Sequence, residues 1–388
     1  MFSTFQSHQP DFDYLKSVEI EEKINDISWL EPYHYSHFLL TTNDKTVKFF
    51  RISETTKAQI LPHGPRPSSG GGRDGSQRFL SRESSLSSSP VHDGKCKKVF
   101  SNAHHYNIHS VSVCSDQEYF ISSDDLRINL WSLERNDTCF TIVDIKPENM
   151  EDLAEVITTA QFHTFEPCIF VYTTSKGLTK LCDTRMNAIC DVPALVFNEN
   201  HYINDSQFAE ATLSISSFDF GSDPNLFLTR DYLNVNVWDL RMNKASLETH
   251  GVQEYLNHDD MLNMVYENDC LFDRFDARFT KNDKCIVTGT YNNMFAHRTR
   301  GEEEVDTTLY FRADLEHIQN RNNTKTLEPY HVTGPVTMPR KKNGCVQSID
   351  VQNMNFDQKI SSLDCHPRED LLVVGVEGML LFLKNDKT

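Results

Sequence analysis

Apolar and polar residues along this chain alternate in short runs that come in pairs. In each pair, a run rich in β-branched and aromatic residues stops at an acidic, amide or glycine residue, and a second, alternating run follows. This pattern is typical of a β-hairpin. It predicts six hairpins, at residues 38–53, 119–134, 169–185, 226–242, 285–300 and 371–386. Their turns are predicted near residues 44, 125, 176, 231, 291 and 377.

A further strand-like run precedes every predicted hairpin. These runs are residues 25–31, 108–113, 157–162, 215–220, 275–280 and 360–365. Three strands and a connecting outer strand per unit make the blade of a β-propeller, and each blade must stack on its neighbours to bury its two faces. We therefore predict an all-β fold, in which residues 1–388 form a single β-propeller domain with six visible blades.

The second unit has the residues of a WD repeat. That pattern places a histidine at the blade entry, a serine or threonine in the second strand, an aspartate at the turn and a tryptophan in the third strand. Those places are filled by His104, Ser122 or Ser123, Asp124 or Asp125, and Trp131, and a second WD tryptophan is Trp238. A buried chain of such polar groups locks a blade because each group finds a partner away from water. We assign structural roles to His104, Ser123, Trp131 and Trp238.

Residues 54–98 differ from the rest of the chain in composition. Within them, residues 61–98 contain nine Ser, six Gly and four Pro, and seven basic residues against three acidic ones. Such a stretch cannot bury enough apolar surface to offset the entropy lost on ordering. We predict a disordered insertion over residues 54–98.

The charge of the chain indicates what kind of partner it favours. Fifty-six acidic and thirty-eight basic side chains give a net charge of −18, which speaks against general affinity for nucleic acid and favours partners with clustered Lys and Arg. No run reaches eighteen apolar residues and the N-terminus lacks a basic, apolar leader, so we expect no membrane span and no secretory signal. The ten cysteines form no C-x-x-C pair, and we expect reduced thiols in a cytoplasmic protein, with the nucleus as a second location.

Motifs of catalysis and cofactor binding are missing from the sequence. The chain has no nucleophile elbow, no phosphate-binding loop and no dinucleotide fingerprint, and His105 and His109 lack the intervening glutamate of zinc peptidases. An acidic cluster could be a calcium or general-acid site, but its spacing favours a short helix with a solvated face. The cluster consists of Glu148, Glu151, Asp152 and Glu155. We expect no enzyme activity, no metal and no cofactor.

Several phrases are more specific than any repeat pattern. The first group is FSTFQSHQPDFDYLKSVEIEEKINDISWL (2–30), TNDKTVKFF (42–50), SDDLRINLW (123–131) and FTIVDIKPENMEDLAEVITTAQFH (140–163). The second group is TSKGLTKLCDTRMNAICD (174–191), FLTRDYLNVNVWDLRM (227–242), YENDCLFDRFDARF (266–279) and VTGTYNNMF (287–295). Together these phrases closely resemble the B-type WD-repeat regulatory subunits of protein phosphatase 2A.

The resemblance implies a seven-bladed propeller without an active site of its own. It implies a heterotrimer with a helical-repeat scaffold subunit and a phosphatase catalytic subunit, in which the propeller recruits phosphoserine or phosphothreonine substrates. Members present an acidic upper surface to substrates with basic flanks, which agrees with the net charge. The residues nominated for substrate contact are Asp183, Lys45, Asp44, Asp124, Asp125, Lys176, Asp231, Tyr232, Tyr291 and Asn292. Asp183, Lys45 and Tyr291 are the strongest nominations, and each could instead be a turn residue held by its own backbone hydrogen bonds.

Two departures from the family pattern leave other interpretations open. The family has a strand-rich blade before the STFQSH phrase, and the present sequence starts at Met1. The family also has an ordered hairpin arm where this chain has the Ser/Gly-rich stretch. A generic WD-repeat adaptor of another complex, or a truncated copy without function, are the alternatives.

Overall fold

The computed structural model describes most of the chain. It covers residues 4–14, 16–34, 36–56, 90–198, 208–301, 308–313, 329–333, 347–350, 355–366, 369 and 371–384. All structural statements below refer to these residues.

Six β-sheets follow one another along the described chain. The first contains β3 (Asp26–Tyr33), β4 (Ser36–Thr42), β5 (Val47–Thr56) and β6 (Pro90–Phe100), and the second β7 (Ser110–Val113), β8 (Tyr119–Ser123), β9 (Arg127–Ser132) and β10 (Cys139–Asp144). The third contains β11 (Ile157–Phe162), β12 (Ile169–Thr174), β13 (Leu178–Asp183) and β14 (Leu195–Asn198), and the fourth β15 (Ser217–Phe220), β16 (Leu226–Arg230), β17 (Asn234–Asp239) and β18 (Glu248–Gly251). The fifth contains β19 (Ala277–Phe279), β20 (Cys285–Gly289), β21 (Met294–Thr299) and β22 (Leu309–Arg312), extended by β23 (Pro329–Thr333) and β24 (Gln347–Asp350), and the sixth β25 (Leu363–Cys365), β26 (Leu371–Val376) and β27 (Met379–Lys384).

Each sheet is a propeller blade with its first strand innermost. Successive strands within a blade pair antiparallel, and the exception is the parallel pair β23–β24. In the third blade, Val171 of β12 lies opposite Leu181 of β13. Directly opposite residues on paired strands point to the same face of the sheet, and because the fourth blade covers this face, both side chains are buried. The predicted all-β propeller with six units is confirmed, and every predicted hairpin coincides with the second and third strands of a blade.

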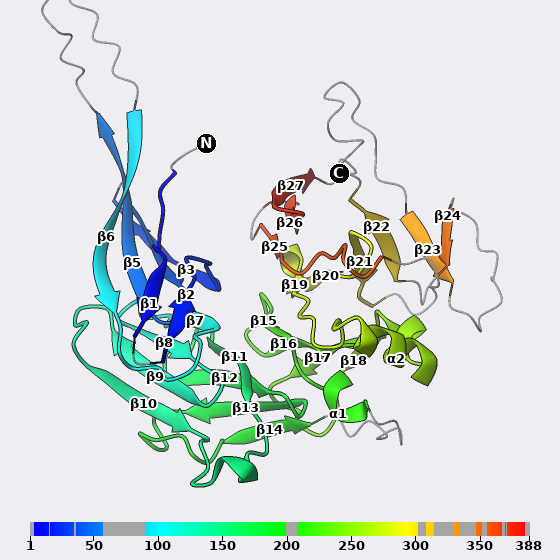
Figure 1. Cartoon of the computed structure of the whole chain (residues 1–388), viewed down its shortest axis with the longest axis horizontal. Helices are drawn as coiled ribbons and strands as arrows, with labels where there is room; N and C mark the ends of the chain where they lie inside the picture. Colours follow the sequence, from blue (N-terminus) through cyan, green and yellow to red (C-terminus); the bar gives the residue numbers. More distant parts are fainter. Residues whose placement is uncertain are drawn as a thin grey trace, which may run out of the picture.

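The blades form an arc around a central opening (Figure 1). Apolar clusters fill the spaces between neighbouring blades. The cluster between the first two blades contains Leu40, Phe100, Phe120 and Trp131, with the rings of Phe120 and Trp131 stacked at a centroid distance of 6.1 Å. Burying aromatic surface on both faces of a sheet is what makes a blade depend on its neighbours.

The arc is open between its first and last blades (Figure 1). The outward face of the first blade is partly covered by residues 4–10, where Phe5 packs on a small cluster that includes Phe50. Trp29 on this face stays 61% exposed, and Phe382 on the outward face of the last blade stays 66% exposed. Apolar faces that a neighbouring blade would cover are therefore accessible at both ends of the arc.

Part of the segment predicted to be a disordered insertion forms strands. β5 continues through residues 54–56 and β6 covers residues 90–98, all of which had been assigned to the insertion. The two strands pair with each other along these ends, with Thr56 opposite Pro90. Residues 57–89 lie outside the described part of the chain.

Short helices occur in the connectors between blades and, in one case (η3), between two strands of the fifth blade. They are η1 (Met150–Asp152), α1 (Ala209–Thr212), η2 (Glu254–Leu256), α2 (Asp259–Glu267) and η3 (Lys281–Asp283), and a separate hairpin pairs β1 (Asp11–Asp13) with β2 (Val18–Ile20). η1 contains part of the acidic cluster, as the short helix predicted there requires, and its cap is Asn149. Among the described residues, no helix combines the length and apolar character needed to cross a membrane.

Candidate functional site

Every blade has two ends, and one of them carries most of the candidate residues. We call this end the upper surface: it contains the turns between the second and third strands, at 43–46, 124–126, 175–177, 231–233 and 291–293, and the connectors between blades at 145–156 and 252–274. Strand direction places them together, because each connector leaves an outer strand at the end where the neighbouring turn lies. The amide of Ile145, for example, donates to the carbonyl of Leu126 over 3.0 Å.

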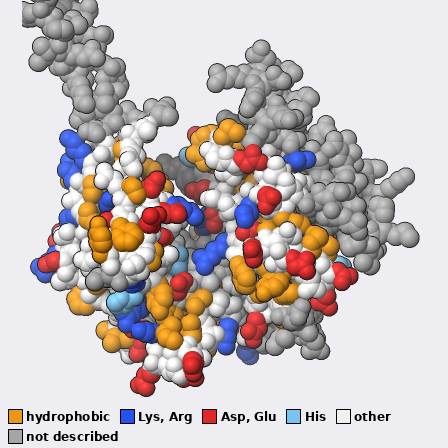
Figure 2. Space-filling model, in the orientation of Figure 1, with side chains coloured by type: hydrophobic (Ala, Val, Ile, Leu, Met, Phe, Trp, Pro, Cys, Tyr) orange, Lys and Arg blue, Asp and Glu red, His pale blue; other side chains and the backbone are white. Residues whose placement is uncertain are grey.

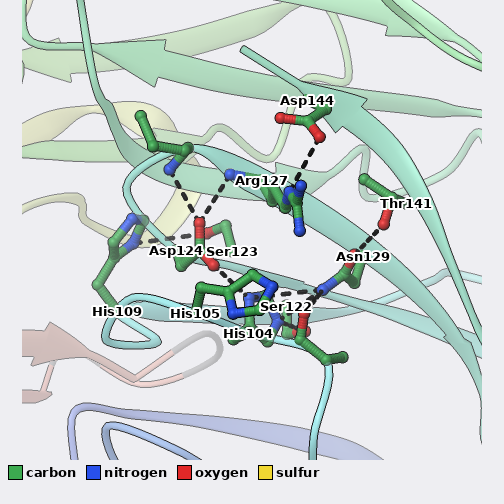
Figure 3. A network of polar contacts seen from close by, with 12 residues as sticks. His104, His105, His109, Ser122, Ser123, Asp124, Arg127, Asn129, Thr141 and Asp144 are labelled. Carbon is green, nitrogen blue, oxygen red and sulfur yellow. Dashed lines mark hydrogen bonds and ion pairs between the residues drawn. The ribbon is translucent and has the colours of Figure 1, made fainter. Parts of the chain in front are cut away.

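A buried chain of hydrogen bonds supports the upper surface of the second blade (Figure 3). His104 contacts the Asp124 carboxylate through Nδ1 at 2.9 Å and the Ser122 hydroxyl through Nε2 at 2.6 Å. Trp131 Nε1 donates to the same hydroxyl at 2.8 Å. The network predicted for His104 and Trp131 is present, but its serine is Ser122. The sequence left Ser122 and Ser123 open for this place; because adjacent strand residues face opposite sides, Ser123 is buried on the other face, where it contacts the Ser110 hydroxyl.

Asp124 belongs to this network and not to the exposed surface. Its carboxylate also accepts the amides of Leu126 at 2.9 Å and Arg127 at 2.7 Å. Burial opposes ionisation, but the hydrogen bonds from His104 and from the two amides outweigh it and lower the pKa of Asp124. The side chain is fully buried, which argues against contact with a docked protein.

Four further nominated residues are also buried. Asp231 accepts the amides of Leu233 and Asn234, and burial raises its pKa. The Tyr232 and Tyr291 hydroxyls share a hydrogen bond of 2.9 Å, and Tyr291 also donates to the carbonyl of Cys270. Asn292 has a positive φ of 61° in its turn. Together with Asp124, these side chains hold turns in place.

The remaining nominated residues of the upper surface reach solvent. Lys176 is exposed, and Asp44, Lys45 and Asp125 are half-buried. Lys45 forms an ion pair of 2.9 Å with Asp13 from the β1–β2 hairpin.

Asp125 has an electrostatic environment of its own. Burial raises its pKa, the neighbouring Asp124 carboxylate adds to the rise, and the Arg274 guanidinium opposes it. The Asp125 carboxylate is therefore partly accessible, and it is under the influence of Arg274, which lies about 150 residues further along the chain. A basic group arriving from outside would find an acceptor here.

Beside these residues, a cavity of about 550 Å³ opens on the upper surface. It lies between the third, fourth and fifth blades, and its floor includes Thr158 and Ser216. Lys176, Glu210, Asp273 and Arg274 supply charges of both signs, and Phe272 and Val156 supply apolar surface. A groove of mixed character suits a peptide segment better than a small molecule.

The connectors around this cavity are rich in acidic residues. Residues 145–156 contain four acidic side chains and one basic, and residues 252–274 contain six acidic and one basic. Figure 2 shows Lys and Arg beside Asp and Glu around the central opening. The surface of the molecule is therefore not uniformly acidic, and the excess of acidic residues is found in these connectors. Arg274, Glu210 and Phe272 have no counterpart among the residues nominated from the sequence, because those came from hairpin turns and from the LCDTR phrase, whereas these three lie in connectors between blades.

Asp183 lies at the opposite end of its blade. Lys176 precedes the first residue of β13 and Asp183 is the last residue of the same strand. The Asp183 carboxylate accepts from Arg185 Nη2 at 2.8 Å and Nε at 3.0 Å. Asp239 of the WD dipeptide makes the same fork with Arg241, at 2.6 Å and 2.9 Å. The repeated geometry gives Asp183 a local role in a turn, at a distance from the upper surface.

The described residues offer little to a metal or cofactor. No group of three or more His, Cys, Asp or Glu side chains within them converges in a way that could hold a metal ion. His109 is half-buried, and burial lowers its pKa to about 4, so at neutral pH it is an uncharged member of the blade interface. The nine cysteines in the described part of the chain all have free thiols.

Comparison with known proteins places this architecture in a family. Residues 94–132 match the model "WD domain, G-beta repeat". A solved structure, Raptor of Chaetomium thermophilum, superposes with a TM-score of 0.52 at 11% identity, covering 97% of this chain and 26% of that one, and supports the fold alone. The "Protein phosphatase PP2A 55 kDa regulatory subunit" of Drosophila melanogaster is 43% identical over 390 residues, which is 100% of this chain and 75% of the relative.

The aligned region spans the whole chain. Identity at this level over the full length of the chain is far above what a shared propeller fold produces by itself, as the Raptor comparison illustrates. The resemblance inferred from the phrases is therefore confirmed: this chain belongs to the family of 55 kDa regulatory subunits of protein phosphatase 2A.

Proposed function

We propose that this regulatory subunit binds the scaffold and catalytic subunits of protein phosphatase 2A and holds phosphoprotein substrates on its upper surface. The observation that carries the proposal is the set of acidic connectors at 145–156 and 252–274 around a cavity that contains both apolar and charged groups. Substrates with basic residues beside their phosphoserine or phosphothreonine complement this surface.

The physical role of the subunit is to raise local concentration. A substrate held beside the catalytic subunit meets it at the effective concentration set by the tether, and dephosphorylation accelerates without any chemistry on the propeller. Acidic connectors also increase the encounter rate with basic segments, an effect that falls as ionic strength rises.

Asp125 is the first residue we assign to substrate contact. It is half-buried on the upper surface, its neighbour Asp124 accepts the amides of the turn, and the Arg274 guanidinium acts on its charge. Asp183, at the other end of a blade and already paired with Arg185, supplies a matched control. Both are aspartates, and reversing either one changes the net charge of the chain by the same amount.

The experiment measures capture of a phosphopeptide with basic flanks by the purified full chain. Asp125→Lys is expected to weaken binding about tenfold, because a like charge replaces an acceptor near Arg274, while Asp183→Lys stays within about twofold of the parent. Equal binding by all three proteins would remove Asp125 from the site. Equal losses in both variants would show that net charge acts without a localised site.

Assembly is tested separately. The scaffold and catalytic phosphatase subunits are expected to co-purify with the parent and with both variants at low salt. Failure of the parent to retain either subunit would reject the assignment of partners and favour an adaptor of a different complex.

A further inference from the structure

The third blade contains two buried cysteines that lie close together. Cys182 lies in β13, and Cys190 lies in the connector that leads from β13 to β14. Both are almost completely buried, at 1% and 2% exposure, and the Cys182 Sγ lies 4.0 Å from the carbonyl oxygen of Cys190.

Cys190 is anchored while the chain on its N-terminal side is exposed. Its amide donates to the carbonyl of Ile142 in β10 of the neighbouring blade at 2.7 Å, and its thiol contacts the carbonyl of Asn187 at 3.7 Å. Residues 185–189 are all exposed. Local opening of such a segment lets a small oxidant reach the buried thiols without unfolding of the blade.

The two thiols differ in acidity. Donation to Cys190 and burial both raise the pKa of Cys182, so this thiol keeps its proton. The same hydrogen bond lowers the pKa of Cys190 against the opposing effect of burial. The thiolate is the nucleophile in sulfur chemistry, which makes Cys190 the attacking group and Cys182 the resolving one.

From this geometry we infer that Cys182 and Cys190 form an oxidation site that closes into a disulfide in the presence of a peroxide. The Cys190 thiolate attacks one peroxide oxygen, the O–O bond breaks, and hydroxide leaves to become water, which yields a sulfenic acid. The Cys182 sulfur then attacks that sulfur, the S–O bond breaks, and a second water leaves with the Cys182 proton. Two thiols lose two hydrogens and one peroxide is reduced to two waters.

The disulfide would close a ring across the turn that carries the Asp183–Arg185 fork. Met186 and Ile189, both more than half exposed, lie within that ring. A covalent link would restrict this segment and, through the Ile142 contact, fix it against the second blade. The site lies at the end of the blade opposite the upper surface, so it is independent of substrate capture as proposed above.

Peptide mapping tests the inference on the intact chain. The full chain is exposed to increasing hydrogen peroxide, its remaining thiols are alkylated, and it is digested with trypsin under non-reducing conditions. Cleavage after Lys180 and Arg185 separates the two cysteines, so the disulfide appears as LCDTR (181–185) joined to the peptide that begins at Met186. The expected result is this cross-linked pair, lighter by two hydrogens than the sum of its peptides and released by dithiothreitol.

The outcomes that overturn the inference are equally specific. Recovery of Cys182 and Cys190 as separately alkylated peptides, at a peroxide dose that oxidises the exposed Cys96, would refute it, and so would pairing of either residue with another cysteine. Cys190→Ser is expected to abolish the cross-link and Cys96→Ser to preserve it. Mapping of the parent protein decides the question even where a variant fails to fold.

Discussion

Adjacent residues on a strand can have opposite roles, and the second blade provides a clear case. Ser122 faces the second blade's polar network and Ser123 faces away from it, where it contacts Ser110. The sequence predicted that one serine would join His104 and Trp131, but strand periodicity alone does not reveal which of two neighbours faces the network. The choice depends on the register with the preceding strand, which fixes Ser123 opposite Ser110.

This assignment predicts different costs for two neighbouring substitutions. Ser122→Ala leaves the buried Trp131 Nε1 and one nitrogen of His104 without the hydroxyl they share, and it is expected to destabilise the chain by about 1–3 kcal/mol. Ser123→Ala should cost less, because Ser110 keeps its hydrogen bond from the amide of Ala160. Chemical denaturation of the two variants measures the difference. A larger loss of stability in Ser123→Ala than in Ser122→Ala would contradict the placement of Ser122 in the network.

The candidate site was predicted only in part for a related reason. The turns between strands were found from hairpin signals, yet five of the nominated side chains point inward. Turn aspartates such as Asp124 and Asp231 are used by their own backbone amides, which a sequence shows only as an acidic residue at a turn. Arg274 could not be predicted from the sequence, because only the fold brings it from a different blade close enough to act on Asp125.

At the scale of elements, the innermost strands bring charged side chains toward the centre of the arc. Asp26 of β3 accepts the amide of Val111 from β7, and Asp219 of β15 accepts the amide of Phe279 from β19. Arg278 of β19 lies 3.7 Å from Asp219 and 3.7 Å from Asp364 of β25. The blades are therefore connected near their inner edges by polar contacts as well as by apolar clusters.

Burial of these carboxylates predicts a pH effect with a definite sign. Burial raises the pKa of Asp26 to about 6. Between about pH 4 and pH 6, this carboxyl group is therefore protonated more often in the folded state than in the unfolded state. The free energy of unfolding consequently falls as the pH rises through this interval. The neutral side chain of Asp26→Asn removes the cost of burying an ionised carboxylate. Its stability relative to the parent is expected to increase by up to about 3 kcal/mol across that interval and to stay level above it.

Urea unfolding at intervals between about pH 4 and pH 7 measures this difference. Asp219→Asn provides an independent repeat, because burial raises the pKa of Asp219 to about 6 as well. Parallel stability curves for the parent and Asp26→Asn throughout the range would contradict the predicted burial effect.

Strand prediction succeeded where alternation reflects burial and failed where it does not. β11 matches its predicted run residue for residue, since both of its faces contact neighbouring blades. The ends of β5 and β6 were missed because residues 54–56 and 90–98 are mostly polar, although the two strands pair with each other there. The fifth blade's parallel pair β23–β24 also lacked a hairpin pattern in the sequence.

At the scale of the whole molecule, the open arc has consequences for association. Trp29 and Ile27 on the first blade and Phe382 and Leu380 on the last are all exposed, and β27 pairs with β26 alone among the described strands. Contiguous apolar surface beside an unpaired strand edge promotes contact between chains. The chain described here is therefore expected to self-associate through these faces as its concentration rises.

The double variant Trp29→Gln with Phe382→Gln tests this expectation. Removing two large exposed aromatics from the ends of the arc should weaken self-association at least tenfold, because burying each such side chain contributes about 1.5–3 kcal/mol. Phe140→Gln is the matched control, since Phe140 is 69% exposed on the outer strand of the second blade, away from both ends. Sedimentation velocity over a range of concentrations distinguishes the variants. If Phe140→Gln lowers association as much as the double variant does, contact arises from general surface hydrophobicity, and the ends of the arc have no special part in it.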